Sequence, residues 1–250
     1  MKNSSEKFTG KADAYSLARP AYPKKFLDDL YEEFGCSTNS VIADIGSGTG
    51  KLTRMLLEKG NKVFAIEPNA DMREKAESQL NIYKNFYSIN ACAENTTLSD
   101  KSIDFITVAQ AFHWFDTPKF KTECRRISKP QTKVFLIWNT RDEKASINID
   151  SAKIFQDFCP DFVGFQGGIK ENDKKINDFF DGKYGKKIYE NNIEYNKESF
   201  IARYLSSSYS LKSEDKDYSK FLQNIQLIFD KYAINGKVFI PNNTQVYFNL

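Results

Sequence analysis

The chain has 250 residues, enough for one large domain, and its 40% of hydrophobic residues suffice for a packed core. The formal net charge is only +3 and the paired lysines are scattered, which argues against a nucleic-acid-binding surface. A single histidine and four cysteines without CxxC spacing argue against a zinc site and fit free thiols in a reducing cytoplasm.

The N-terminal residues 1–10 contain no hydrophobic signal region, and no apolar run in the chain approaches the roughly 20 residues that span a bilayer. We therefore expect a soluble cytoplasmic protein that does not contact a membrane. Residues 8–23 mix aromatic side chains with prolines, which discourage a long helix. This segment either packs on the fold as a leader or folds over a ligand as a lid, with Tyr15, Arg19 and Tyr22 as the covering residues.

Residues 41–50, VIADIGSGTG, form the most informative stretch of the chain. A short apolar run ends in Gly46, Gly48 and Gly50, and an amphipathic run then continues to Gly60, which predicts a strand, a tight turn and a helix. Glycine permits positive φ in the turn and lets a ligand approach the backbone without a Cβ in the way. The free N–H groups at the start of the helix would face that ligand.

The spacing of these glycines separates two classes of ligand. A dinucleotide fingerprint has the pattern GxGxxG, whose third glycine packs the helix on its strand, but Lys51 occupies that position here. The observed pattern is GxGxG, with Asp44 two residues before the first glycine. The next predicted strand, 61–67, ends at Glu67, whose carboxylate can accept hydrogen bonds from the hydroxyls of a ribose.

The following segments continue the alternation of strand and helix. Asn69 can cap a helix that extends through Leu80, with Met72 and Ala76 facing inward. The other elements predicted in this part are helices at 26–34 and around 118–128, the second ending before Pro130, and strands at 86–90, 103–109 and 134–138. Five strands that alternate with helices predict a doubly wound, mostly parallel α/β sheet with helices on both faces.

Ligands of such sheets bind beyond the carboxyl ends of the strands, near the point where the strand order reverses. The segments that follow the five strands should therefore face one crevice. These segments are the glycine turn, Glu67, Ala93-Glu94, residues 110–115 and residues 139–142.

The second part of the chain breaks the alternation. Residues 141–182 are rich in phenylalanine, and they form either an insertion that caps the crevice or a purely structural excursion. A strand at 186–195, helices at 197–207 and 214–233, and a terminal strand at 244–250 follow. We expect one domain, made of a leader or lid at 1–35, a ligand-binding core at 36–140, an insertion at 141–182, and C-terminal helices and edge strands at 183–250.

These segments resemble the class I S-adenosylmethionine-dependent methyltransferases of the type 11 group, and within it the trans-aconitate-methyltransferase-like small-molecule enzymes. The likeness is carried by the leader between Phe8 and Pro23, by DIGSGTGKLT at 44–53, by AIEPNADM at 65–72, by AQAFHWFD at 109–116 and by WNTRD at 138–142. The resemblance implies a Rossmann-like, seven-stranded sheet of order 3-2-1-4-5-7-6 and S-adenosylmethionine as the methyl donor.

The resemblance also implies roles for the residues around the crevice. The glycine turn would border the amino-acid part of the donor, Glu67 would hold its ribose, and Ala93-Glu94 would flank its adenine. The expected cofactor-binding residues are Tyr15, Arg19, Asp44, Gly46, Ser47, Gly48, Gly50, Glu67, Asn69, Met72, Ala93, Glu94, Gln110 and Phe112. The expected acceptor-binding residues are Tyr22, His113, Trp114, Asn139 and Arg141, and no metal is expected.

Methyl transfer is an in-line displacement at a sulfonium carbon, so the protein chiefly aligns the nucleophile, with the reacting atoms about 3–3.5 Å apart. Aromatic faces such as that of Trp114 can stabilise the sulfonium cation by roughly 0.5–2 kcal/mol. A base is needed only when the acceptor arrives protonated. His113 is then the candidate catalytic base, and otherwise it is a wall or orienting residue. Arg141 or Arg19 could pair with an acidic acceptor.

The sequence also bears on the class of acceptor. The residues after the fourth strand are QAFHW, where amino-methylating nucleic-acid enzymes carry a D/N-P-P-Y/F run, and Cys159-Pro160 reverses the Pro-Cys of cytosine-methylating enzymes. We therefore expect a small-molecule acceptor, with a carboxylate as one candidate, no nucleic-acid partner, and a monomer or homodimer. The alternatives are a non-catalytic S-adenosylmethionine-binding protein and a nicotinamide-dependent oxidoreductase.

Overall fold

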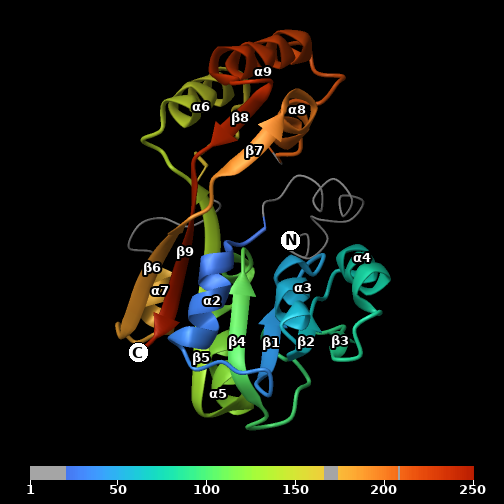
Figure 1. The fold of residues 1–250 in the computed structure, drawn as a ribbon, viewed down its shortest axis with the longest axis vertical. Helices are drawn as coiled ribbons and strands as arrows, with labels where there is room; N and C mark the ends of the chain where they lie inside the picture. The colour runs from blue at the N-terminus through green and yellow to red at the C-terminus, as the bar shows by residue number, and fades with distance from the viewer. Residues whose placement is uncertain (1–20, 166–173, 208) are drawn as a thin grey trace.

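The computed structural model describes residues 21–165, 174–207 and 209–250, which are arranged around a seven-stranded sheet of order β3-β2-β1-β4-β5-β9-β6 (Figure 1). Its strands are β1 (Val41–Ile45), β2 (Lys62–Ile66), β3 (Phe86–Ile89), β4 (Ile103–Ala109), β5 (Ser128–Arg141), β6 (Tyr184–Glu190) and β9 (Asn242–Asn249). The first five strands pair in parallel, and β9 runs antiparallel to both β5 and β6. The predicted sheet order is confirmed, with β9 as the seventh strand of the prediction.

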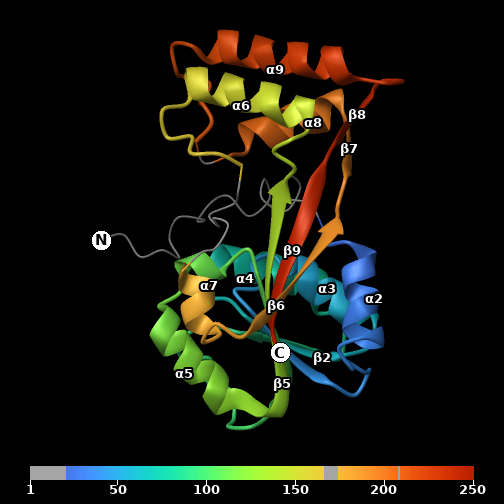
Figure 2. The same cartoon turned by 90° about the vertical axis from the view of Figure 1, so that its left-hand side faces the viewer.

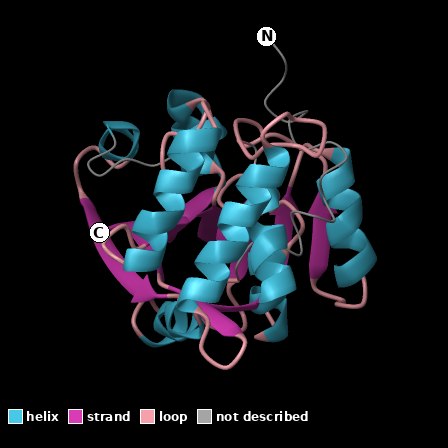
Figure 3. Ribbon diagram, turned by 90° about the horizontal axis from the view of Figure 1, so that it is seen from above, coloured by secondary structure: helices cyan, strands magenta, loops and turns pink. Residues whose placement is uncertain are grey.

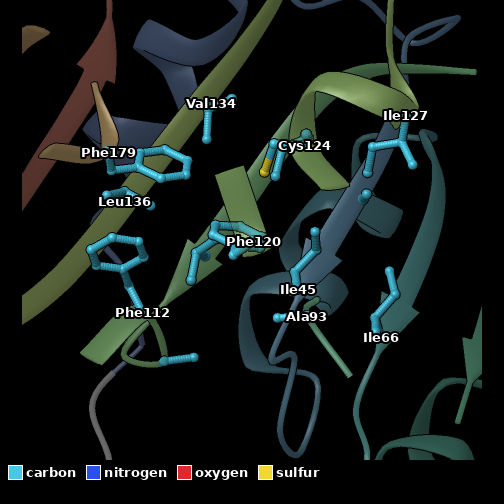
Figure 4. Packing of buried hydrophobic residues seen from close by; sticks show 14 of the residues in the cluster. Ile45, Ile66, Ala93, Phe112, Phe120, Cys124, Ile127, Val134, Leu136 and Phe179 are labelled. Atoms are coloured by element: carbon cyan, nitrogen blue, oxygen red, sulfur yellow. The ribbon is translucent and has the colours of Figure 1, made fainter. Parts of the chain in front are cut away.

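Helices cover both faces of this sheet (Figure 3). Side chains alternate along each strand, so Ile42 of β1 faces the core under α2 (Lys24–Glu32), α3 (Lys51–Glu58) and α4 (Ala70–Leu80). Ile45 of the same strand faces the opposite core, under α5 (Thr117–Ile127) and α7 (Lys174–Phe179). Figure 4 shows this second core, where Phe120 and Cys124 of α5 pack with Phe179 over the strands.

The helix boundaries follow local chemistry. The side chain of Asn69 caps α4 by accepting a hydrogen bond from Met72 N at 3.0 Å, as predicted, and Asp116 caps α5 in the same way through Lys119 N. Gly50 precedes α3 with φ of 79°, a left-handed conformation that favours glycine. The glycine turn is therefore fixed directly against the start of a helix.

The fifth strand is longer than the predicted 134–138, because it begins at Ser128 and continues to Arg141. The preceding helix ends at Ile127, before Pro130 as predicted, but the strand starts at once, so Pro130 lies within β5. The register between β4 and β5 is irregular between Ile103 and Phe105, beside Pro130, so the missing N–H of the proline breaks no regular ladder.

The predicted strand at 186–195 was wrong as a single element. β6 ends at Glu190, and β7 (Ile193–Asn196) pairs instead with β8 (Lys237–Ile240) in a separate two-stranded sheet. Asn192 marks the break, since its Oδ1 accepts a hydrogen bond from the backbone N of Asn242 at the start of β9. Period-two patterning continues through the break, so the sequence alone did not reveal that the chain changes sheets.

A second lobe, which we call the cap lobe, lies beyond the carboxyl ends of β1, β4 and β5 (Figures 1 and 2). It consists of α6 (Ser146–Phe158), β7, α8 (Lys197–Leu205), α9 (Tyr218–Tyr232) and β8. Its separate core is aromatic and includes Phe155, Phe200, Tyr204, Phe221 and Phe229. Residues 141–182 thus supply one helix to the cap lobe and one, α7, to the face of the large sheet. The proposed domain boundaries stay a prediction.

Candidate functional site

A cleft opens at the carboxyl ends of β1, β4 and β5. This is the edge at which open α/β sheets bind ligands. Its lining residues come from the glycine turn, the start of α3, the ends of β4 and β5, and the segment before α2, namely Tyr22, Asp44, Gly46, Ser47, Gly48, Thr49, Lys51, Leu52, Ala109, Gln110 and Asn139. The glycine turn, Gln110 and Asn139 converge here as the strand order predicted, whereas Glu67 and Ala93-Glu94, expected at the same crevice, are not among the lining residues.

The three glycines of the turn all have positive φ, but they differ in the space around their α-carbons. A Cβ on Gly46 would lie 2.5 Å from Cβ of Ala111, and one on Gly50 would lie 2.5 Å from Cδ1 of Leu80. A Cβ on Gly48 would meet no atom of the described ranges within 4 Å. Gly46 and Gly50 therefore allow the turn to pack closely on the fold, whereas the backbone of Gly48 is open to a ligand.

Glu67 connects the glycine turn to the next helix. Its Oε2 accepts a hydrogen bond from Gly48 N at 2.9 Å, and its Oε1 accepts one from Asn69 N, also at 2.9 Å. Burial raises the pKa of this carboxyl above its ordinary value, and the two backbone N–H groups oppose the rise. Each carboxylate oxygen keeps a further lone pair, so Glu67 can hold the turn and still accept hydrogen bonds from a ligand.

Asp44 lies at the base of the cleft with 1% of its surface exposed. Its carboxylate accepts hydrogen bonds from Oγ1 of Thr53 at 2.6 Å and Oγ1 of Thr107 at 2.9 Å. Burial raises its pKa to about 6, since two neutral hydroxyls compensate only part of the lost hydration. These two threonines were not among the predicted site residues; Thr53 ends the DIGSGTGKLT motif and is the one that the sequence could have indicated.

Gln110 and Asn139 form the wall of the cleft opposite the turn. Gln110 has φ of 59°, an uncommon conformation for a residue with a side chain, and its Nε2 donates to the carbonyl of Asn139 at 3.1 Å. Oδ1 of Asn139 accepts from Oγ1 of Thr244 at 2.5 Å, which fixes the amide to β9. Both residues were predicted at this edge, and the structure brings both into the lining.

Other predicted residues lie elsewhere. Phe112 was predicted to bind the cofactor, but it is only 1% exposed. Its ring packs against Phe120, Trp138 and Phe179 in the core instead of facing the cleft (Figure 4). The short helical turn η2 (Phe112–Trp114) directs this side chain under the sheet. Met72 and Ala93 are likewise buried, at 3% and 5% exposure, while Glu94 accepts a hydrogen bond from Asp116 N at 2.8 Å.

His113 and Trp114 follow β4, and neither lines the cleft. Their rings lie 4.7 Å apart, and the indole is 39% exposed. The carbonyl of His113 also accepts a hydrogen bond from Nζ of Lys175, at 3.4 Å. The predicted residues Tyr15 and Arg19 lie outside the described residues.

Arg141, the last residue of β5, extends toward the cap lobe. It is 6% exposed, its Nη1 donates to the hydroxyl of Tyr204 at 3.1 Å, and its Cζ lies 3.8 Å from the ring centre of Phe165. Arg141 is not among the residues that line the cleft, whereas Asn139 is. The predicted acceptor-binding set is thus divided between the cleft and the junction with the cap lobe.

Two kinds of structural feature are absent from the described ranges. None of the helices there combines the length and apolarity needed to cross a bilayer. No cluster of three or more His, Cys, Asp or Glu side chains in these ranges could hold a metal ion.

Comparison with known proteins places these features in context. Residues 43–136 match the family model described as a methyltransferase domain. An uncharacterized methyltransferase of Mycobacterium tuberculosis is 35% identical over 137 residues, which is 55% of this chain and 54% of the relative. A methyltransferase-like protein of Schizosaccharomyces pombe is 31% identical over 159 residues, or 61% of this chain and 60% of the relative. The alignments thus span little more than half the length of these relatives.

Solved structures share the fold at low sequence identity. A protein from Anabaena variabilis, described as a methyltransferase of an antibiotic biosynthesis pathway, superposes with a TM-score of 0.65 at 19% identity, covering 94% of this chain and 99% of that one. Phosphoethanolamine N-methyltransferase 2 of Haemonchus contortus, solved with S-adenosylhomocysteine, has a TM-score of 0.57 at 15% identity, covering 99% of this chain and 59% of that one.

Proposed function

We infer from the methyltransferase domain at residues 43–136 that this chain is a class I S-adenosylmethionine-dependent methyltransferase of the type 11 group. The relatives that align with this domain are also named methyltransferases. The resemblance recognised in the sequence is confirmed at this level. The trans-aconitate-methyltransferase-like subtype stays a prediction.

The observation that carries the proposal is the open backbone of Gly48 next to two carboxyl groups. Among the described residues, no atom lies within 4 Å of a Cβ position at Gly48, so a donor can approach the turn past this part of the chain. Asp44 lies at the base of the same cleft, and Glu67 already accepts a hydrogen bond from Gly48 N. This set fits a donor that carries a ribose and positive charge, with Glu67 binding the sugar and Asp44 facing the charged part.

When bound, S-adenosylmethionine supplies a methyl group that is already activated on a sulfonium. The residues of this chain would therefore orient the donor and the acceptor and exclude water. Gln110 is placed to contact the donor and Asn139 to orient the acceptor, since both line the cleft beside the glycine turn. We propose a small-molecule acceptor with a carboxylate as the methylated group, because an ionised carboxylate needs no base.

The test is to measure binding of S-adenosylhomocysteine and NAD by calorimetry and to follow transfer of a labelled methyl group into a metabolite extract. We expect micromolar binding of S-adenosylhomocysteine, no binding of NAD, and a labelled small molecule. Binding of NAD alone would instead support the oxidoreductase alternative. Tight S-adenosylhomocysteine binding without transfer to any acceptor would support a non-catalytic binding protein.

His113 is the proposed catalytic base for an acceptor that arrives protonated. For an ionised carboxylate acceptor, we expect His113→Gln to lower kcat by less than about tenfold and to leave the pH profile of kcat unchanged. The measurement is kcat from pH 5.5 to 9 for both proteins, once the labelled acceptor is known. Loss of the acidic limb of the profile in the variant would identify His113 as the base and reject the carboxylate as the methylated group.

A further inference from the structure

We propose that Arg141 forms an anion subsite at the junction of the sheet and the cap lobe, and that it anchors a carboxylate of the acceptor that is not itself methylated. This proposal rests on the proposed function for the identity of the acceptor. The binding of an anion by Arg141 stands independently of that function.

The first observation is the surroundings of the guanidinium. Arg141 is 6% exposed, and its contacts are neutral: the hydroxyl of Tyr204 at 3.1 Å, the ring of Phe165 at 3.8 Å and the ring of Tyr204 at 4.7 Å. In the described parts of the chain, no carboxylate forms an ion pair with it, whereas the exposed Arg125 and the partly buried Arg126 both have acidic partners. A buried cation without a counter-ion costs several kcal/mol.

The hydrogen bonds beyond Tyr204 supply no negative charge. Since Tyr204 accepts from Arg141, its own proton is directed to Oγ of Ser151 at 2.5 Å, and that hydroxyl donates to the carbonyl of Ile147 at 2.5 Å. The chain of hydrogen bonds holds the guanidinium in place from the α6 side. It uses one N–H group, and an arginine has five.

The second observation is position. Side chains two residues apart along a strand point to the same side, so Arg141 extends from the face of β5 that carries Asn139. Asn139 lines the cleft, and Tyr204 belongs to α8 of the cap lobe. An acceptor that extends from the cleft toward the cap lobe would therefore pass Asn139 and reach Arg141.

The chemistry favours an anchoring role over a reacting one. A planar guanidinium binds a carboxylate through two parallel charge-assisted hydrogen bonds. Those bonds occupy oxygen lone pairs and lower the nucleophilicity of the oxygens. The group held by Arg141 is therefore a specificity contact, and the methyl group goes to another atom of the acceptor, nearer the glycine turn.

Titration of the protein with succinate and with inorganic phosphate, in the presence of S-adenosylhomocysteine, tests the subsite by calorimetry and thermal unfolding. We expect succinate to bind and to raise the unfolding temperature. We expect Arg141→Gln to weaken succinate binding at least tenfold, to leave S-adenosylhomocysteine affinity unchanged, and to keep the unfolding temperature without anion at or above that of the unsubstituted protein. Phosphate binding stronger than succinate binding would assign the anchor to a phosphorylated acceptor and overturn the carboxylate.

The matched control is Arg125→Gln, which removes an exposed arginine paired with Asp181 and should leave succinate binding unchanged. Arg141→Lys keeps the charge without the planar fork, so an intermediate affinity is expected, and this variant serves if the glutamine variant does not fold. Equal succinate affinity with and without Arg141, or no anion effect on the unsubstituted protein, would overturn the subsite. Failure of S-adenosylhomocysteine to bind would reject the proposed function alone, because the anion titration can be run without it.

Discussion

Glu67→Ala is expected to weaken binding of S-adenosylhomocysteine by about 10- to 1000-fold. A hydrogen bond to a charged group contributes about 1.5–3 kcal/mol, and the carboxylate of Glu67 can form one or two of these with a ribose. The same carboxylate accepts hydrogen bonds from Gly48 N and Asn69 N, so its removal also loosens the turn. Calorimetry with both proteins, at a temperature well below unfolding, measures the change in affinity.

The two roles of Glu67 can be separated. A purely structural role would lower the free energy of unfolding by about 1–3 kcal/mol, since two backbone N–H groups lose their acceptor, and would leave the affinity unchanged. Glu67→Gln keeps the size of the side chain but removes the charge. Its affinity for S-adenosylhomocysteine should therefore lie between those of the unsubstituted protein and Glu67→Ala. The control is Glu58→Ala, which removes a carboxylate on α3 whose hydrogen bond to Tyr83 is exposed. Unchanged donor binding in Glu67→Ala would contradict the proposed cofactor site.

The large sheet was predictable because its signals are local. Each parallel strand is a short apolar run, and the caps and glycines that separate strand from helix, such as Asn69 and Gly50, stand directly in the sequence. The cap lobe lacked such signals. Its core is assembled from residues far apart in the chain, such as Phe155 and Phe221, and a periodic pattern does not tell which distant partner a face will meet.

The candidate site was likewise predictable only in part. The strand ends correctly located Asp44, Gln110 and Asn139 at one edge, since parallel strands finish together. The direction in which each side chain points, toward the core or toward the cleft, was not predictable. Phe112 and Gln110 are two residues apart, yet one is in the core and the other lines the cleft, because the chain leaves β4 through a left-handed residue and a tight turn.

The negative charge of Asp44 should lower the stability of the donor-free protein and strengthen the binding of the donor. Its pKa of about 6 in the folded protein lies above the ordinary value of about 3.9, so the folded state binds the proton more tightly than the unfolded state. The contribution to stability is therefore greatest below pH 4 and is lost as the pH rises through 6. At neutral pH the charged, buried carboxylate costs about 3 kcal/mol relative to its protonated form, as an order of magnitude.

Asp44→Asn is therefore expected to raise the free energy of unfolding of the donor-free protein at pH 7.5 by about 1–3 kcal/mol and to remove the loss of stability between pH 4 and 6. The hydroxyls of Thr53 and Thr107 can rotate to accommodate the amide. The same substitution should weaken donor binding by about tenfold or more, because the cleft loses the negative charge that faces a cationic ligand. Urea unfolding across pH and calorimetry with S-adenosylmethionine measure the two effects.

The control is Asp181→Asn, which removes an exposed carboxylate paired with Lys121 and should change stability by less than about 1 kcal/mol. If Asp44→Asn destabilised the protein at pH 7.5 and left donor affinity unchanged, Asp44 would be a structural hydrogen-bond acceptor without a role in the cleft. If it stabilised the protein while donor affinity fell, the buried charge would be retained for binding at the expense of stability. That trade-off is what a site that binds a cation requires, because the charge that destabilises the empty cleft is the one that stabilises the occupied one.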